Sequence, residues 1–467
     1  MDTEITLQAL GGAETVTGSK YLLRTPSITL LIDCGLFQGA KSLREKNWAP
    51  PVVAPNQVDA VIITHAHLDH CGYLPLWIKN GYKGKVYMSA PTAELTELIL
   101  RDSARLQEED AEKANRHGYS KHRPAKPLYD TDDVEASLPY FCKCDVDTVY
   151  TLNDQVSFRL LPAGHITGAC SVEIDGYGKK LFFSGDIGRY SSGFIKPPQN
   201  DIAADIVVME STYGDRLHEH YDVDCRLAFI INTALENNGN ILIPCFAVGR
   251  AQEIIHRLNL LKLHKEIPQE LPVYLDSPMA EAAGQITMHY PEWLAIDEKE
   301  AVTLENGVII NAYAAGTSKI IRKKGSKIIL AASGMLTGGR VLEYLKHYLP
   351  NPKNTILLIG FQAEGTRGRA LLNHACEVKL YGHYYPVSAH IEYIDALSAH
   401  ADQSELLRWL KNFKKRPDQI YLVHGEPCAQ EALRIKVKDT IGIEPVILKP
   451  DIAVHLFDTA KHQQMLV

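Results

Sequence analysis

The residues best suited to chemistry stand in segment 64–70, Thr-His-Ala-His-Leu-Asp-His, directly after the apolar run 58–63. Three imidazoles and one carboxylate are crowded together there, and zinc prefers these donors in catalytic sites. A helix or a strand would point some of these side chains away from the others. A turn after a buried strand can gather all of them around one small centre. The segment therefore predicts a metal site, and a histidine-rich surface loop is the alternative.

Three further segments place matching donors at the ends of apolar runs. His165 follows the run that ends at Pro162, and Asp186 follows the run 181–183. Upstream, Asp33 ends the run 29–32 in an Asp-x-Gly sequence. The pattern H-x-H-x-D-H, followed and preceded by these partners in this order, resembles the signature of the metallo-β-lactamase fold.

The second half of the chain indicates a branch of that superfamily. Glu210 ends an apolar run, and His400 and His424 each follow a short apolar stretch. Their segments are similar to motifs A, B and C of the β-CASP group. This nucleic-acid-processing branch includes the endonuclease subunit of the mRNA 3′-end cleavage factor. A histidine at motif C is typical of its RNA-directed members, whereas the DNA-repair members typically carry an apolar residue there.

The resemblance implies a ligand set for two zinc ions. It assigns His65, His67 and His165 to one zinc, Asp69, His70 and His424 to the other, and Asp186 to both. Asp33 would support the site from behind by accepting a hydrogen bond from a ligand histidine.

The resemblance also implies the catalytic residues. His400 would protonate the leaving oxygen, and Glu210 would keep its ring charged and oriented. Asp69 belongs to the catalytic set as well as to the ligands. A buried, hydrogen-bonded histidine is the alternative interpretation of His400.

Several turns in the second half expose backbone amides and guanidinium groups that could bind phosphates. In the family such loops line the substrate cleft. The expected substrate-binding residues are Arg250, Ser333, Gly334, Gly365, Thr366, Arg369 and Ser398. Ordinary strand-to-helix turns are the alternative, because such turns also require glycine.

The pattern of elements predicts an α/β protein with an insertion. Residues 91–117 are expected to form a helix, as are residues 131–138 with Thr131 as N-cap. Short apolar strands at 240–244, 272–276, 327–331 and 354–359 alternate with helix-like runs, which is typical of a parallel sheet. The resemblance implies a metallo-β-lactamase αββα sandwich over 1–208 and 386–467, with an inserted β-CASP domain of parallel-sheet type over 209–385. The metal site should lie at their junction, with the insertion acting as a lid.

Composition limits the partners and the compartment. The net charge of −7 in 467 residues counts against a broad electrostatic grip on nucleic acid. Nine scattered cysteines predict a reducing cytoplasm rather than a disulfide framework. No stretch approaches the roughly 20 apolar residues of a membrane span, and no signal peptide is expected.

The motifs and the resemblance they carry imply a zinc-dependent ribonuclease that hydrolyses single-stranded RNA through a metal-bound hydroxide and cuts it internally. No membrane partner is expected. The alternatives are a 5′-3′ exoribonuclease or DNA nuclease of the same family, a small-molecule metallo-hydrolase, and a non-catalytic scaffold. A homodimer is left open.

Overall fold

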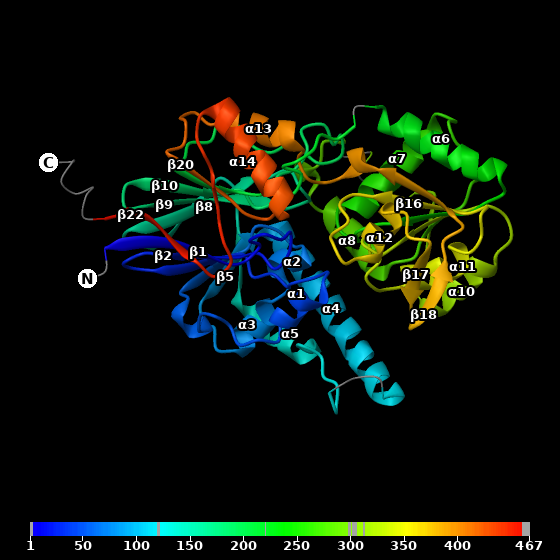
Figure 1. The fold of residues 1–467 in the computed structure, drawn as a ribbon, viewed down its shortest axis with the longest axis horizontal. Helices are drawn as coiled ribbons and strands as arrows, with labels where there is room; N and C mark the ends of the chain where they lie inside the picture. Colours follow the sequence, from blue (N-terminus) through cyan, green and yellow to red (C-terminus); the bar gives the residue numbers. More distant parts are fainter. Residues whose placement is uncertain are drawn as a thin grey trace. The chain divides into compact units, whose positions relative to one another are not determined.

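The structure is a computed structural model that describes residues 3–118, 122–219, 221–297, 300, 306–311 and 313–459. The chain divides into two compact units. The first comprises residues 1–191, 196–217 and 400–467, and the second comprises residues 192–195 and 218–399. Figure 1 shows the elements of each unit.

The first unit contains a sheet in which β3, β4, β5 and β6 run parallel to one another. Its strand order is β22 (Ala453–Asp458), β1 (Glu4–Gly11), β2 (Lys20–Arg24), β3 (Thr29–Ile32), β4 (Ala60–Ile62), β5 (Lys85–Ser89) and β6 (Phe141–Cys144). The helices of this half are α1 (Lys41–Lys46), α2 (Leu68–Cys71), α3 (Leu74–Lys79), α4 (Ala90–His117) and α5 (Thr131–Ser137). Apolar side chains of α3, α4 and α5, including Trp77, Leu100 and Val134, pack on Val61 and Val86 of the sheet.

A second sheet completes the first unit. Its strand order is β21 (Val446–Ile447), β20 (Gln419–Leu422), β11 (Ile206–Met209), β10 (Lys179–Phe183), β9 (Cys170–Gly176), β8 (Val156–Pro162) and β7 (Val149–Asn153). The helices α13 (Gln403–Lys411) and α14 (Pro427–Ile441) belong to this half of the unit (Figure 1). They pack on the sheet through Trp409 and Leu433. The two sheets meet face to face, since the rings of Tyr87 and Phe158 lie 5.1 Å apart. The unit is therefore the expected αββα sandwich.

The second unit is built on a parallel sheet that is covered on both faces. Its strand order is β14 (Val308–Ile310), β13 (Val273–Leu275), β15 (Ile328–Ala331), β12 (Ile241–Pro244), β16 (Thr355–Ile359) and β19 (His390–Ile394). One face packs on α6 (Val223–Glu236), α7 (Arg250–Leu263) and α8 (Pro278–Met288). The other packs on α10 (Ala314–Arg322), α11 (Val341–Tyr348), α12 (Arg367–Leu372) and the hairpin of β17 (Glu377–Leu380) and β18 (His383–Pro386). The α/β class expected for the insertion is thus confirmed.

Two local details differ from the expectations. The second unit ends at residue 399 rather than 385, because β19 pairs with β16 in its sheet, and residues 209–217 belong to the first unit. The N-cap of α5 is Asp130 rather than Thr131, since the Asp130 side chain accepts from the backbone N–H of Asp133 in a capping box.

Among the described helices, none is long and apolar enough to cross a membrane. All nine cysteines are described, and each is a free thiol.

Candidate active site

The predicted metal ligands of the first unit converge at the ends of its strands. The 64–70 segment leaves β4 and enters α2, His165 follows β8, Asp186 follows β10, and His424 follows β20. Close backbone approach makes this possible: a Cβ atom at Gly35 would lie 1.7 Å from the carbonyl oxygen of Asp69. The glycine of the Asp-x-Gly sequence is therefore required by the packing of α2 beside β3.

One group of donors surrounds a single carboxylate oxygen. The Nε2 atoms of His65 and His165 lie 3.4 and 3.6 Å from Oδ2 of Asp186. The Nδ1 atom of His67 lies 3.0 Å from Nε2 of His65 and 3.2 Å from Nε2 of His165. Donor atoms bound tetrahedrally at about 2.0–2.1 Å from one zinc ion would be about 3.3 Å apart, which is close to these separations.

A second group surrounds the other oxygen of the same carboxylate. Nε2 of His70 and Nδ1 of His424 lie 3.3 and 3.5 Å from Oδ1 of Asp186. The Nε2 atoms of His70 and His424 are 3.2 Å apart, and Oδ2 of Asp69 lies 3.4 Å from Nε2 of His424. Asp186 thus presents one oxygen to each group, as a bridging ligand would.

The electrostatics of the cluster favour a cation at its centre. Burial holds the pKa of His65 well below its ordinary value and lowers that of His67 to about 4, so both rings are neutral and available as donors. Burial also lowers the pKa of His70, but the carboxylates of Asp186, Asp33 and Asp69 outweigh it and raise the pKa well above the usual value. The carboxylates therefore attract positive charge, which a divalent metal would supply in place of a proton. The donor types and the spacing both fit a metal.

Several side chains orient the ligands from behind. Oδ2 of Asp33 lies 2.7 Å from Nδ1 of His70, and both Asp33 oxygens accept hydrogen bonds from Thr64. Burial raises the pKa of the Asp33 carboxyl, although His70 and Thr64 oppose that shift. The sequence interpretation gave no role to Thr64 or Thr212, whose hydroxyls lie 3.0 Å from Nδ1 of His65 and 3.1 Å from Nδ1 of His424. Their position beside a motif residue was the only available signal.

His400 and Glu210 form a pair at the edge of the cluster. Nδ1 of His400 lies 3.1 Å from both carboxylate oxygens of Glu210, and its Nε2 lies 3.9 Å from Oδ2 of Asp186. Glu210 is fully buried, and its Oε1 accepts a 2.6 Å hydrogen bond from the backbone N–H of Ile187. Burial lowers the pKa of His400, but Glu210 and Asp186 outweigh it and raise the pKa above the ordinary value. The arrangement suits His400 as a proton donor. Its ring nitrogens also make it a candidate metal ligand together with Asp186 and Glu210.

The expected substrate-binding residues all lie in the second unit. Arg250 is buried, forms an ion pair with Glu253 and donates to the carbonyl oxygen of Leu397. Ser398 is also buried, and its backbone N–H donates to the carbonyl oxygen of Asp395. In this structure, Arg250 and Ser398 therefore contact other residues of the second unit.

The remaining members of that set lie after β15 and at the start of α12. Ser333 and Gly334 follow β15, and the Ser333 hydroxyl accepts from the backbone N–H of Thr337. Thr366 caps α12 by accepting from the backbone N–H of Arg369 at 3.2 Å, and Gly365 precedes it with a φ of 76°. The Arg369 guanidinium lies 3.1 Å from the Glu364 carboxylate.

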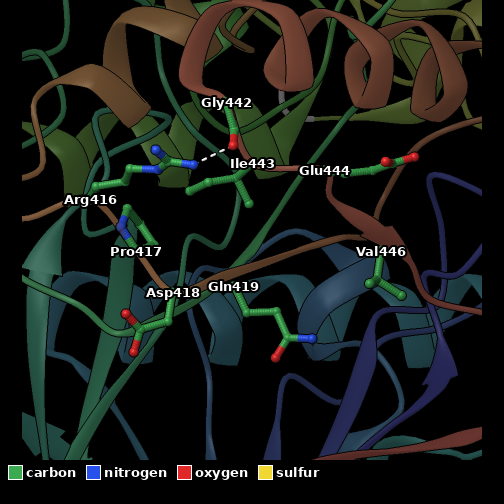
Figure 2. A pocket seen from close by; sticks show the side chains of 8 residues that line it. All are labelled: Arg416, Pro417, Asp418, Gln419, Gly442, Ile443, Glu444 and Val446. Carbon is green, nitrogen blue, oxygen red and sulfur yellow. Dashed lines mark hydrogen bonds between the residues drawn. The ribbon is translucent and has the colours of Figure 1, made fainter.

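A separate pocket of about 580 Å³ in the first unit shares no lining residue with the histidine cluster (Figure 2). Its lining residues lie at and just before the start of β20, and between the end of α14 and the start of β21. Arg416 donates there to the carbonyl oxygen of Gly442. Its carboxylates, Asp418 and Glu444, lie close to lysines: Asp418 accepts from Lys179 and Glu444 from Lys438. These partners account for the charges of the pocket, which lacks the donor set of a metal site.

Three family models match successive parts of the chain. Residues 15–226 match the metallo-β-lactamase superfamily, residues 251–371 the β-CASP domain, and residues 384–448 the Zn-dependent metallo-hydrolase RNA specificity domain.

Known proteins give the same result over nearly the whole length. The chain is 35% identical to Ribonuclease TTHA0252 of Thermus thermophilus over 89% of this chain and 92% of that protein. It is 31% identical to transcription termination factor FttA of Methanocaldococcus jannaschii over 91% of this chain and 67% of that protein. A crystal structure of a protein of unknown function from Enterococcus faecalis shares the fold, with a TM-score of 0.53 and 12% identity over 97% of this chain and all of that one. The chain therefore belongs to the β-CASP family of metallo-β-lactamase-fold nucleases and is a metal-dependent hydrolase.

Proposed function

We propose that this protein is a zinc-dependent ribonuclease that cuts single-stranded RNA internally. The observation that carries the proposal is the position of Asp186, whose two oxygens face two separate groups of imidazole and carboxylate donors. His65, His67 and His165 would hold one zinc, Asp69, His70 and His424 would hold the other, and Asp186 would contact both.

The zinc ions, when bound, would supply Lewis acidity and a water of lowered pKa. His400 would donate the proton on Nε2 to the leaving oxygen of the broken phosphodiester. Glu210 would hold the opposite nitrogen, so that Nε2 keeps its proton and its direction. Since Glu210 is itself fixed by the backbone N–H of Ile187, the His400 ring is held in place before the substrate arrives.

RNA is the substrate that the sequence and the relatives favour. His424 occupies motif C and is a candidate metal ligand. Its Nδ1 lies 3.1 Å from the Thr212 hydroxyl, which would orient the ring. The Thermus thermophilus relative is named a ribonuclease. The net charge of −7 favours local contacts over a broad basic surface as the means of binding.

The test is cleavage by zinc-supplemented protein of labelled single-stranded RNA and DNA of the same sequence. We expect RNA to be cut and DNA to be cut more slowly. A covalently closed circular RNA should also be linearised, since internal cutting needs no free end. Cleavage of linear RNA but not of circular RNA would indicate an exoribonuclease rather than an endonuclease. Cleavage of DNA at the same rate, or of neither polymer, would overturn the ribonuclease proposal.

A further inference from the structure

The hairpin of β17 and β18 in the second unit carries two exposed tyrosines. Its two-residue turn, Tyr381-Gly382, has positive φ at both positions, 49° and 85°. Turns of this kind favour asparagine and glycine, because a bulky side chain is disfavoured in the left-handed region. Tyr381 nevertheless occupies the first position, and 54% of its surface is exposed. Tyr381 therefore stands in a backbone conformation that disfavours tyrosine, with more than half of the residue exposed.

A second ring stands on the outer face of the hairpin. Tyr384 is 61% exposed and is paired across the strands with Lys379, so the two side chains share one face. The ammonium group of Lys379 lies 5.5 Å from the centroid of the Tyr384 ring. An exposed ring with an adjacent cation suits an unpaired base and its phosphate.

The opposite face of the hairpin packs against the apolar core of the second unit. Val378 and Leu380 are buried in the apolar core beside α11, and Tyr385 packs against the same core. The backbone N–H of Val387 also donates to the carbonyl oxygen of Cys376 at 2.9 Å. The core is therefore filled by other side chains, and the exposed rings of Tyr381 and Tyr384 remain at the surface.

Arg367 joins the hairpin to one of the candidate phosphate loops. Its Nε donates to the carbonyl oxygen of Lys379 at 2.9 Å, and its guanidinium also donates to the carbonyls of Leu336 and Thr337 at 2.9 and 3.2 Å. The loop that begins at Ser333 is thus fastened beside β17. A strand of RNA on that loop could continue onto the hairpin.

The charge of this segment differs from that of the chain as a whole. Residues 367–390 carry three cationic side chains against one carboxylate, Glu377, whereas the whole chain has a net charge of −7. His374, His383 and His390 are exposed in the same segment. Arg369 is engaged by Glu364, and Lys379 is the cation placed next to the Tyr384 ring. The local excess of positive charge favours a polyanion over an acidic or neutral protein surface.

We propose that Tyr381, Tyr384 and Lys379 form a base-stacking subsite for unpaired bases of single-stranded RNA. The proposal rests on the proposed ribonuclease function and extends it to a position of the RNA held by stacking on the second unit. The rings would accept bases with little regard to sequence, because every base has a face that can stack.

The test measures binding of a fluorescent oligouridylate of about 16 nucleotides, and of an abasic oligomer of equal length, to the full chain. The test variant combines Tyr381→Asn, which suits the turn, with Tyr384→Ala. We expect about five- to a hundredfold weaker binding of the oligouridylate, and less than about twofold change for the abasic oligomer, which has nothing to stack. Tyr384→Phe alone should bind the oligouridylate as the unaltered protein does, since it retains the ring.

Phe229 supplies a matched control. It is also 61% exposed and also lies beside a cation, Arg226, but it stands on α6, which packs on the other face of the sheet. Phe229→Ala should leave the binding of both oligomers unchanged.

The outcomes separate this proposal from the ribonuclease proposal. Binding does not require cleavage, so an inactive but RNA-binding protein would overturn the ribonuclease function and leave the subsite testable. Unchanged oligouridylate binding by the double variant would overturn the subsite, as would equal weakening of both oligomers. Unchanged RNA binding together with a smaller mass of the double variant in light scattering would assign the rings to a protein interface instead.

Discussion

Oδ2 of Asp33 lies 2.7 Å from Nδ1 of His70, while Nε2 of the same ring lies 3.3 Å from Oδ1 of Asp186. The ring is therefore held between a supporting carboxylate and the centre of the cluster. An ionised Asp33 fixes the proton on Nδ1 and leaves Nε2 free to bind a metal. This contact links the Asp-x-Gly sequence after β3 to the histidine motif after β4.

Replacing Asp33 should weaken metal binding without removing a ligand. We expect Asp33→Ala to lower zinc affinity about 10- to 100-fold, because His70 loses the partner that orients it. Competition with a chromophoric chelator measures the affinity. Asp175→Ala, at an exposed carboxylate on β9, is the control and should leave affinity unchanged. Equal affinities for Asp33→Ala and the unaltered protein would contradict the supporting role.

Elemental analysis should find two zinc ions per chain in protein purified without chelator. Asp186→Ala should reduce binding at both positions, since its oxygens face both donor groups, whereas His424→Ala should affect one. Removal of zinc by chelation should abolish cleavage, and added zinc should restore it. A value of one metal or fewer, unchanged by zinc supplementation, would rule against the two-metal site.

His400→Ala should lower the cleavage rate about 10²- to 10⁴-fold, as expected for the loss of a general acid, and should leave metal content intact. Single-turnover cleavage and elemental analysis on the same preparation provide the two readouts. Loss of one zinc from the variant would show that His400 is a ligand. The role given to His424 would then need revision.

Unstructured RNA should be cut faster than the same sequence in a hairpin stem. The side chains of His65, His165 and Asp186 are buried, so the scissile phosphate must reach a recessed cluster that a flexible strand enters more easily than a duplex. Matched substrates with and without a complementary strand allow the comparison. Equal rates on both would favour an open site.

Ser333→Ala and Arg369→Ala should weaken RNA binding and leave zinc content unchanged, because both residues are expected to contact phosphates, whereas the expected metal ligands all lie in the first unit. Anisotropy with labelled RNA measures binding, and elemental analysis measures zinc. Normal RNA binding by both variants would remove these loops from the substrate site.

The stability of the second unit should depend on Asp276. This buried carboxylate accepts hydrogen bonds from Asn311, Thr317, Arg340 and Tyr344 at 2.6–2.8 Å. Asp276→Ala should lower the free energy of unfolding by about 3–5 kcal/mol, because it removes the carboxylate that pairs with Arg340 and accepts hydrogen bonds from two hydroxyls. Denaturant titration measures the change, and one below about 1 kcal/mol would contradict this account.

The sequence alone predicted the donor types of the site and the class of the fold. The ligand types and their places after apolar runs predicted His65, His67, Asp69 and His70 as one group, because a strand followed by a turn is encoded locally. The alternation of apolar runs and helix-like segments predicted a parallel sheet in the insertion, for the same reason.

Only the tertiary structure decided how distant residues meet. His70 and His424 are 354 positions apart, and β20 brings the second to the cluster by pairing with β11. The division of the Asp186 oxygens between two groups, the support of His424 by Thr212 and the burial of Arg250 against Glu253 depend on the same long-range packing. A local pattern specifies a strand and its turn, but the direction of a side chain at the strand end is set by residues from other parts of the chain.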